Sequence, residues 1–117
     1  MPSINVALAD HNPVMLAAIS EHFDRDPRFS LVAAVNSAEG FLEVALMTPI
    51  TVGVIDWVLP MLGSERLIDI VRTHDAPPRM LVYAHGDNAD IARQAMAAGA
   101  AGFCARSHAP DYLLDTA

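Results

Sequence analysis

The sequence contains no lysine, and all seven of its basic residues are arginine. With fourteen acidic residues, the formal net charge is −7 at pH 7. Affinity for nucleic acid depends on clustered positive charge. The composition therefore argues against direct nucleic-acid binding by this domain, and an acidic surface of this kind mostly favours solubility.

Cysteine and long apolar runs are also scarce. Cys104 is the only cysteine, so no internal disulfide can form, as is usual in a reducing compartment. No apolar stretch approaches the roughly 18 residues that a membrane span needs. The first residues lack the basic and apolar regions of a secretory signal. We therefore expect a soluble cytoplasmic protein with no membrane partner.

Motifs of the common α/β enzymes are absent as well. We find no glycine-rich phosphate loop, no dinucleotide-binding fingerprint and no Gly-x-Ser-x-Gly elbow. These absences disfavour a small α/β enzyme, so we do not expect catalytic turnover of a substrate.

Short apolar runs alternate with segments of helical periodicity along the chain. The runs are residues 4–9, 29–35, 51–55, 79–84 and 101–105. Helices are predicted to begin after capping residues at Asn12-Pro13, at Asn36-Ser37, near Ser64 and at Asp87 or Asn88. This alternation predicts an α/β fold, with a doubly wound, five-stranded parallel sheet covered by helices on both faces.

The chain length matches a single domain, predicted to span residues 1–117. A last helix is expected to begin at Asp111, and the sequence ends at Ala117 after barely two turns. We therefore expect this helix to be truncated and a further domain to follow outside this chain.

Two of the apolar runs end at a carboxylate. One leads to Asp10, and the other leads to Asp56. In open parallel sheets, ligands gather outside the carboxyl ends of the strands, which makes both aspartates candidate site residues. The alternative is that Asp56 only caps the next helix, since aspartate is a preferred N-cap. Pro60 and Gly63-Ser64 favour a helix start further downstream, and hence a functional Asp56.

Three motifs in this order resemble the receiver domain of two-component response regulators, and the resemblance covers essentially the whole chain. They are Ala9-Asp10-His11-Asn12-Pro13-Val14, Val54-Ile55-Asp56-Trp57-Val58-Leu59-Pro60, and the alanine-glycine run from Met96 to Phe103. Arg106-Ser107 followed by Pro110 is similar to receivers that precede a helix-turn-helix DNA-binding domain of the NarL type. The resemblance implies the flavodoxin-like fold of CheY-like proteins.

The resemblance also implies the chemistry. In this family, a histidine kinase transfers a phosphoryl group to an aspartate, which corresponds here to Asp56. The family holds Mg²⁺ through an acidic pair, the phosphoacceptor and a backbone carbonyl. These ligands correspond to Asp10, His11, Asp56 and the carbonyl of Val58.

The metal site departs from the family pattern at His11, which stands where a second carboxylate is expected. Mg²⁺ prefers oxygen ligands, whereas imidazole suits zinc, copper or nickel, so we expect weak Mg²⁺ binding. A protonated His11 would place a positive charge near Asp10 and Asp56 and partly replace the metal. The alternative is an exposed loop histidine without a role.

The switch residues depart from the family pattern too. A small hydroxyl normally binds the phosphoryl group, and either Tyr83 or Ala84 stands in its place. Successive strand residues face opposite sides of a sheet, so only one of the two can point at the site. Arg106 replaces a lysine, and its planar fork is not equivalent to a point charge. Phe103 is either the aromatic that changes rotamer on activation or a core residue of the fifth strand.

We therefore expect a degenerate receiver in two-component signal transduction that is phosphorylated inefficiently at Asp56. The alternative is a phosphorylation-independent module for dimerisation or docking. The expected partners are a histidine kinase, a C-terminal helix-turn-helix output domain that regulates transcription, and a second copy of the chain.

Overall fold

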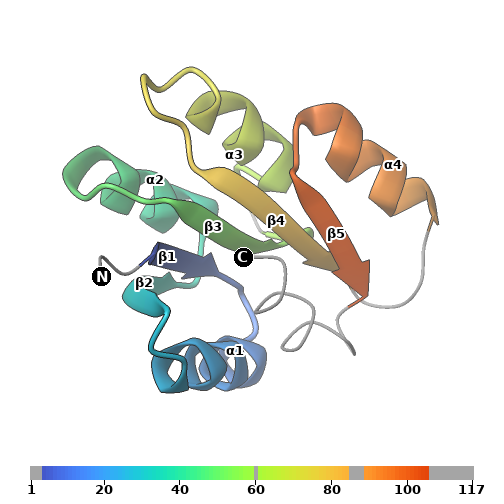
Figure 1. The fold of residues 1–117 in the computed structure, drawn as a ribbon. Coiled ribbons are helices and arrows are strands. Elements are labelled where there is room, and N and C mark those ends of the chain that lie inside the picture. Colours follow the sequence, from blue (N-terminus) through green and yellow to red (C-terminus); the bar gives the residue numbers. More distant parts are fainter. Residues whose placement is uncertain (1–3, 60, 85–88, 106–117) are drawn as a thin grey trace.

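A computed structural model describes residues 4–59, 61–84 and 89–105 of the chain. Its strands are β1 (Ile4–Ala9), β2 (Phe29–Val35), β3 (Val52–Asp56), β4 (Arg79–Ala84) and β5 (Gly102–Ala105). They form one parallel sheet in the order β2-β1-β3-β4-β5 (Figure 1). The helices within the described residues are α1 (Pro13–Arg25), α2 (Ala38–Met47), α3 (Ser64–Val71) and α4 (Ala89–Ala98). The predicted doubly wound sheet is confirmed.

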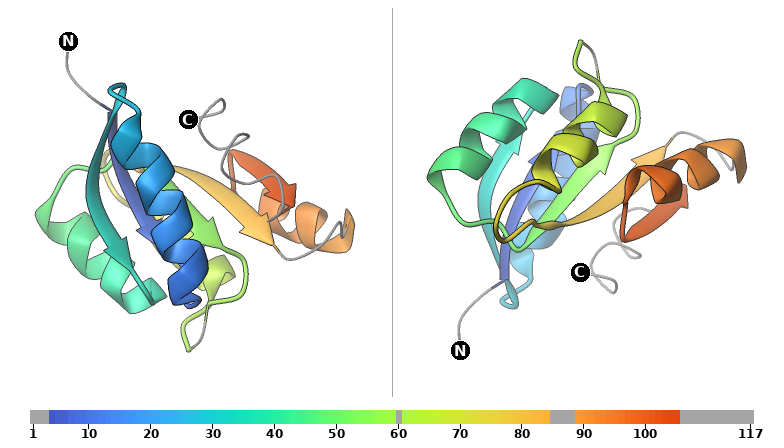
Figure 2. Two further views of the ribbon diagram at one scale, coloured as in Figure 1. Left: turned by 90° about the horizontal axis from the view of Figure 1, so that it is seen from below. Right: turned by 90° about the horizontal axis from the view of Figure 1, so that it is seen from above.

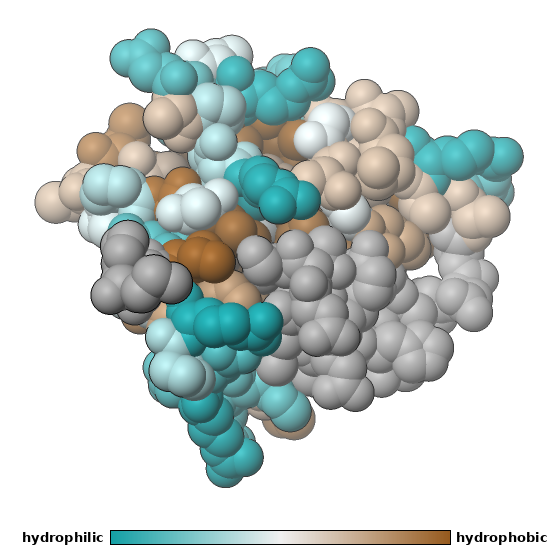
Figure 3. All heavy atoms as spheres, viewed as in Figure 1, coloured by the Kyte–Doolittle hydropathy of each residue, from teal (hydrophilic) through white to brown (hydrophobic). Residues whose placement is uncertain are grey.

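The helices lie in two layers. Figure 2 shows α1 on one side of the sheet and α2, α3 and α4 on the other. Hydrophilic residues gather over α1 at the bottom of the view in Figure 3. No helix in the described part of the chain is long and apolar enough to cross a membrane.

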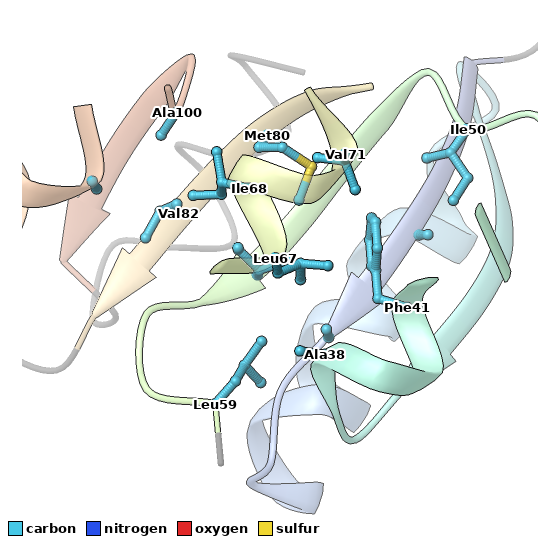
Figure 4. Close-up of a cluster of buried hydrophobic side chains, with 14 residues drawn as sticks. Ala38, Phe41, Ile50, Leu59, Leu67, Ile68, Val71, Met80, Val82 and Ala100 are labelled. Carbon is cyan, nitrogen blue, oxygen red and sulfur yellow. The ribbon is translucent and has the colours of Figure 1, made fainter. Parts of the chain in front are cut away.

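The larger apolar cluster fills the space between the sheet and the layer of α2, α3 and α4. Phe41 of α2 and Leu67 and Ile68 of α3 are fully buried in it, as Figure 4 shows. Gly53 lies beneath them in β3, because an added Cβ would come within 2.6 Å of Phe41 Cζ. The centre of the sheet therefore needs glycine for close packing.

The second cluster lies between the sheet and α1. Ile19 and Phe23 of α1, which lie at helical spacing, are its buried helical residues. The Phe23 ring meets the Phe29 ring of β2 edge to face, with centroids 5.0 Å apart. Both faces of the sheet are therefore covered, which explains why the central strands are apolar without alternation.

The predicted helix starts at Asn12-Pro13 and Ser37 are confirmed. The Asn12 side chain accepts hydrogen bonds from the backbone N–H groups of Val14 and Met15, at 2.9 and 3.2 Å. Ser37 caps α2 in the same way. The predicted cap at Asp87 or Asn88 and the last helix from Asp111 lie outside the described residues.

Candidate functional site

Three neighbouring strands direct polar side chains to one edge of the sheet. Asp10 follows β1, Asp56 is the last residue of β3, and Tyr83 is the penultimate residue of β4. The residues two positions before each of them belong to the cluster beneath α1; they are Leu8, Val54 and Leu81. Since strand side chains alternate between faces, Asp10, Asp56 and Tyr83 all lie on the α1 face.

Asp10 is fully buried, and both of its carboxylate oxygens are bound. Its Oδ1 accepts a hydrogen bond of 2.8 Å from the backbone N–H of Asn12. Its Oδ2 accepts one of 2.6 Å from the hydroxyl of Tyr83. These two bonds compensate for removing the carboxylate from water and fix its orientation.

Asp56 is also fully buried. Its Oδ1 accepts a hydrogen bond of 3.2 Å from the backbone N–H of Val58, and its carbonyl oxygen accepts one from the buried hydroxyl of Ser64. The N-cap of α3 is Gly63, which makes no side-chain cap bond. Asp56 therefore does not cap this helix. The third strand was predicted over residues 51–55, and this boundary was wrong by one residue because β3 includes Asp56.

His11 lies beside both aspartates. Its Nδ1 is 3.2 Å from Asp56 Oδ2 and 3.8 Å from Asp10 Oδ1, and 45% of its side chain is exposed. The ligand atoms of Asp10, His11 and Asp56 all lie within 4.8 Å of one another. The histidine thus faces the buried carboxylates instead of pointing away into solvent.

The three side chains offer two carboxylates and one imidazole to a metal ion. Mg²⁺ prefers oxygen ligands in an octahedral arrangement, so an imidazole nitrogen in this place fits it poorly. Zinc and nickel accept imidazole readily. The carbonyl of Val58, the fourth predicted ligand, stays a prediction; the Val58 N–H donates a hydrogen bond to Asp56 Oδ1. This donor set therefore does not match the Mg²⁺ site that the family resemblance implies.

Tyr83 reaches its partner across a whole strand. β3 lies between β1 and β4, and adjacent strands are about 4.8 Å apart. Tyr83 is paired in register with Asp56, yet its hydroxyl bonds Asp10 on the far side of β3. The phenol must therefore cross the sheet edge next to Asp56. Of the two alternatives at the switch position, Tyr83 and not Ala84 lies on the site face.

Of the two remaining predicted switch residues, the structure describes only Phe103. Phe103 is partly buried and packs against the cluster of α2, α3 and α4, which lies on the other face of the sheet. Arg106 lies outside the described residues.

Two contacts of the site escape the sequence pattern. The Tyr83–Asp10 bond joins residues 73 positions apart, and it follows only from the strand order. The bond from Ser64 to the Asp56 carbonyl is the second, because the sequence pattern predicts only a helix start near Ser64. A polar residue at a buried helix N-terminus behind a strand end is the signal that could have found it.

Known proteins resemble the chain in sequence and in fold. No family model matches it. It is 29% identical over 112 residues to the "Probable transcriptional regulatory protein SgaR" of Hyphomicrobium methylovorum, covering 96% of this chain and 53% of that protein. The chain thus spans about half the length of the curated relatives it matches.

Solved structures give the same result for the fold. A two-component response regulator of the LuxR family from Aurantimonas sp. SI85-9A1 superposes with a TM-score of 0.84 at 25% identity, covering 97% of this chain and 81% of that one. The response regulator domain of Thermotoga maritima CheB gives a TM-score of 0.87 at 19% identity, covering 98% and 93%. The chain has the receiver-domain fold of response regulators, and the predicted resemblance is confirmed.

Proposed function

We propose that the chain is the receiver domain of a two-component response regulator and accepts a phosphoryl group on Asp56. The observation that supports this most is the position of Asp56. It is a fully buried carboxylate at the carboxyl end of the central strand β3, with a histidine nitrogen 3.2 Å from its Oδ2. Ligands of open α/β sheets gather at this edge.

In the proposed step, a carboxylate oxygen of Asp56 attacks the phosphorus of a phosphohistidine on the kinase. A P–O bond forms, the P–N bond breaks, and the released imidazole nitrogen takes a proton from solvent. Nucleophile and phosphoryl group are both anionic, so positive charge is needed between them. His11 Nδ1 lies 3.2 Å from Asp56 Oδ2, where an imidazolium would supply that charge. We derive no step through Mg²⁺, because the donor set fits it poorly.

We propose that the reaction is slow. The small hydroxyl that would bind the phosphoryl group in the family is replaced by the phenol of Tyr83, which is bonded to Asp10. A single imidazole supplies less charge than a divalent ion. Asp56 therefore keeps a nucleophile in place, while two aids to its reaction are weakened.

The proposed partners follow from the family. A histidine kinase would donate the phosphoryl group. The chain covers 53% of SgaR, whose printed name describes a transcriptional regulatory protein. We therefore propose a C-terminal helix-turn-helix output domain and a homodimer in the full-length protein.

The test is phosphorylation by acetyl phosphate, followed by intact-mass spectrometry. Wild type should slowly gain the mass of one phosphoryl group, and Asp56→Asn should gain none. Asp69→Asn is the matched control, because Asp69 is an exposed aspartate on α3 and should not change the labelling. Equal labelling of wild type and Asp56→Asn would disprove the assignment.

A second candidate function is a phosphorylation-independent interaction module. It is favoured by the contacts of the two buried aspartates, since Tyr83 bonds Asp10 and His11 lies against Asp56. Both carboxylates therefore have polar partners without a bound metal or phosphoryl group. A module of this kind would take up no phosphoryl group, and its self-association would not respond to acetyl phosphate.

A further inference from the structure

We infer that Tyr83 is a latch: its phenol, anchored on Asp10, closes the phosphoryl-accepting side of Asp56 and limits the rate at which a donor reaches it. This inference rests on the proposed function of Asp56, and it assigns to Tyr83 the control of access to that site.

The side chain of Tyr83 spans β3 to reach Asp10. β1, β3 and β4 are consecutive in the sheet, so the Cα atoms of Tyr83 and Asp10 lie about two strand spacings apart, or roughly 10 Å. A phenol hydroxyl can bridge this gap only with the ring extended along the sheet edge. That path crosses β3 at the level of Asp56, the register partner of Tyr83. The ring therefore covers the Asp10 side of Asp56.

The phenol of Tyr83 is held at both ends. Its hydroxyl donates a 2.6 Å hydrogen bond to Asp10 Oδ2, a short, charge-assisted bond in a buried place. The acceptor is itself fixed, because the Asn12 N–H binds the other oxygen of Asp10. The ring belongs to the apolar cluster beneath α1, and Tyr83 is only 1% exposed. Moving the phenol would break a bond to a buried carboxylate and expose apolar surface.

Contacts of Asp56 with other described residues also limit the approach of a donor. Its Oδ1 is bound by the Val58 N–H, and its Oδ2 faces His11, which is half exposed. A phosphoryl group adds three oxygens that need space and donors. A donor can approach Asp56 past His11, because nearly half of that side chain is exposed. Opening the latch would free the Asp10 side.

The test compares the rate of phosphorylation by acetyl phosphate among four proteins. Tyr83→Phe removes only the anchoring hydroxyl, and Tyr83→Ala removes the ring as well. Leu81→Ala is the matched control, because Leu81 is a buried residue of the same strand and the same apolar cluster, two positions from Tyr83. It makes a cavity in that cluster while the Tyr83 hydroxyl is kept.

We expect Tyr83→Phe to react about ten- to a hundredfold faster than wild type, the range that corresponds to one hydrogen bond to a charged group. Tyr83→Ala should be at least as fast, and Leu81→Ala should react like wild type. Because Asp56 is buried, local opening of a destabilised protein could also speed the reaction, and Leu81→Ala measures that effect. If Tyr83→Ala does not fold, Tyr83→Phe decides the question, because it keeps the ring in the core.

The latch is refuted if Tyr83→Phe is no faster than wild type, or if Leu81→Ala is accelerated equally. If wild type is labelled at Asp56 and the Tyr83 variants are not faster, the latch fails and the proposed function stands. If only the Tyr83 variants are labelled, the latch holds, but the wild-type chain is closed to phosphate. If no protein is labelled, both proposals fail.

Discussion

Replacing His11 with aspartate should make the stability of the fold depend on a divalent metal. The substitution would place a third carboxylate beside the buried pair of Asp10 and Asp56. In the structure, His11 Nδ1 is 3.2 Å from one of these carboxylates and 3.8 Å from the other. An imidazole carries no negative charge, whereas a carboxylate at this position repels both neighbours.

The size of the effect follows from these distances. Two like charges about 4 Å apart repel by about 4 kcal/mol at an effective dielectric constant of about 20. Position 11 is 45% exposed, so water and salt screen much of this repulsion. We therefore expect His11→Asp to lower the free energy of unfolding by about 1 to 3 kcal/mol without metal. Three oxygen ligands should in turn bind Mg²⁺, and a concentration of about 100 times Kd restores about 2.7 kcal/mol.

The assay is urea unfolding followed by the fluorescence of Trp57, the only tryptophan, first with EDTA and then with increasing Mg²⁺. Wild type should change little with Mg²⁺, while His11→Asp should start less stable and gain stability steadily. His22→Asp is the matched control, because it makes the same substitution at an exposed histidine of α1. It should show no response to Mg²⁺.

Two results would refute this reasoning. If His11→Asp is as stable as wild type in EDTA, position 11 does not interact with the buried carboxylates. If wild type gains as much stability from Mg²⁺ as the variant, the imidazole does not weaken the metal site. In the second case, a magnesium-dependent phosphorylation mechanism would have to be restored.

Three further predictions concern the stability of the fold. Gly53→Ala should cost about 1 to 3 kcal/mol of unfolding free energy in urea, because the new Cβ would lie 2.6 Å from Phe41 Cζ. Ser64→Ala should cost about 1 kcal/mol in the same assay, since its hydroxyl holds the carbonyl at the end of β3. The side-chain hydrogen bonds of Arg28 lower the pKa of Asp26, so this charge stabilises the fold above the unfolded pKa and the effect is lost as pH falls through the lowered pKa. Asp26→Asn should therefore lower Tm at neutral pH and match wild type in strong acid.

The parts of the fold that depend on local chemistry could be predicted from the sequence. The Asn12 cap acts within three residues along the chain, and Pro13 needs only its fixed φ to begin a helix. The burial of Ile19 and Phe23 follows from helical periodicity. Asp56 was recognisable because an apolar run leads directly to it. Each of these signals lies within one element, so no knowledge of the strand order was needed.

The parts of the site that depend on the sheet could not be predicted in the same way. Counting residues left Tyr83 and Ala84 as alternatives, because an error of one residue reverses the face of a strand. The pairing of Tyr83 with Asp56 resolves this alternative. The bond from Tyr83 to Asp10 needs one further fact, which is that β3 lies between β1 and β4. No local pattern contains that order.

His11 and Tyr83 both stabilise the pair of buried aspartates, because each contacts one of the two carboxylates. Two buried carboxylates side by side repel each other and are costly without compensating charge or hydrogen bonds. Here the Tyr83 hydroxyl binds Asp10 and the His11 nitrogen lies against Asp56, so each aspartate has its own partner. A substitution at His11 or at Tyr83 alone leaves the other aspartate with its partner. Because the two aspartates are neighbours, the effects of the two substitutions on the free energy of unfolding should not be additive.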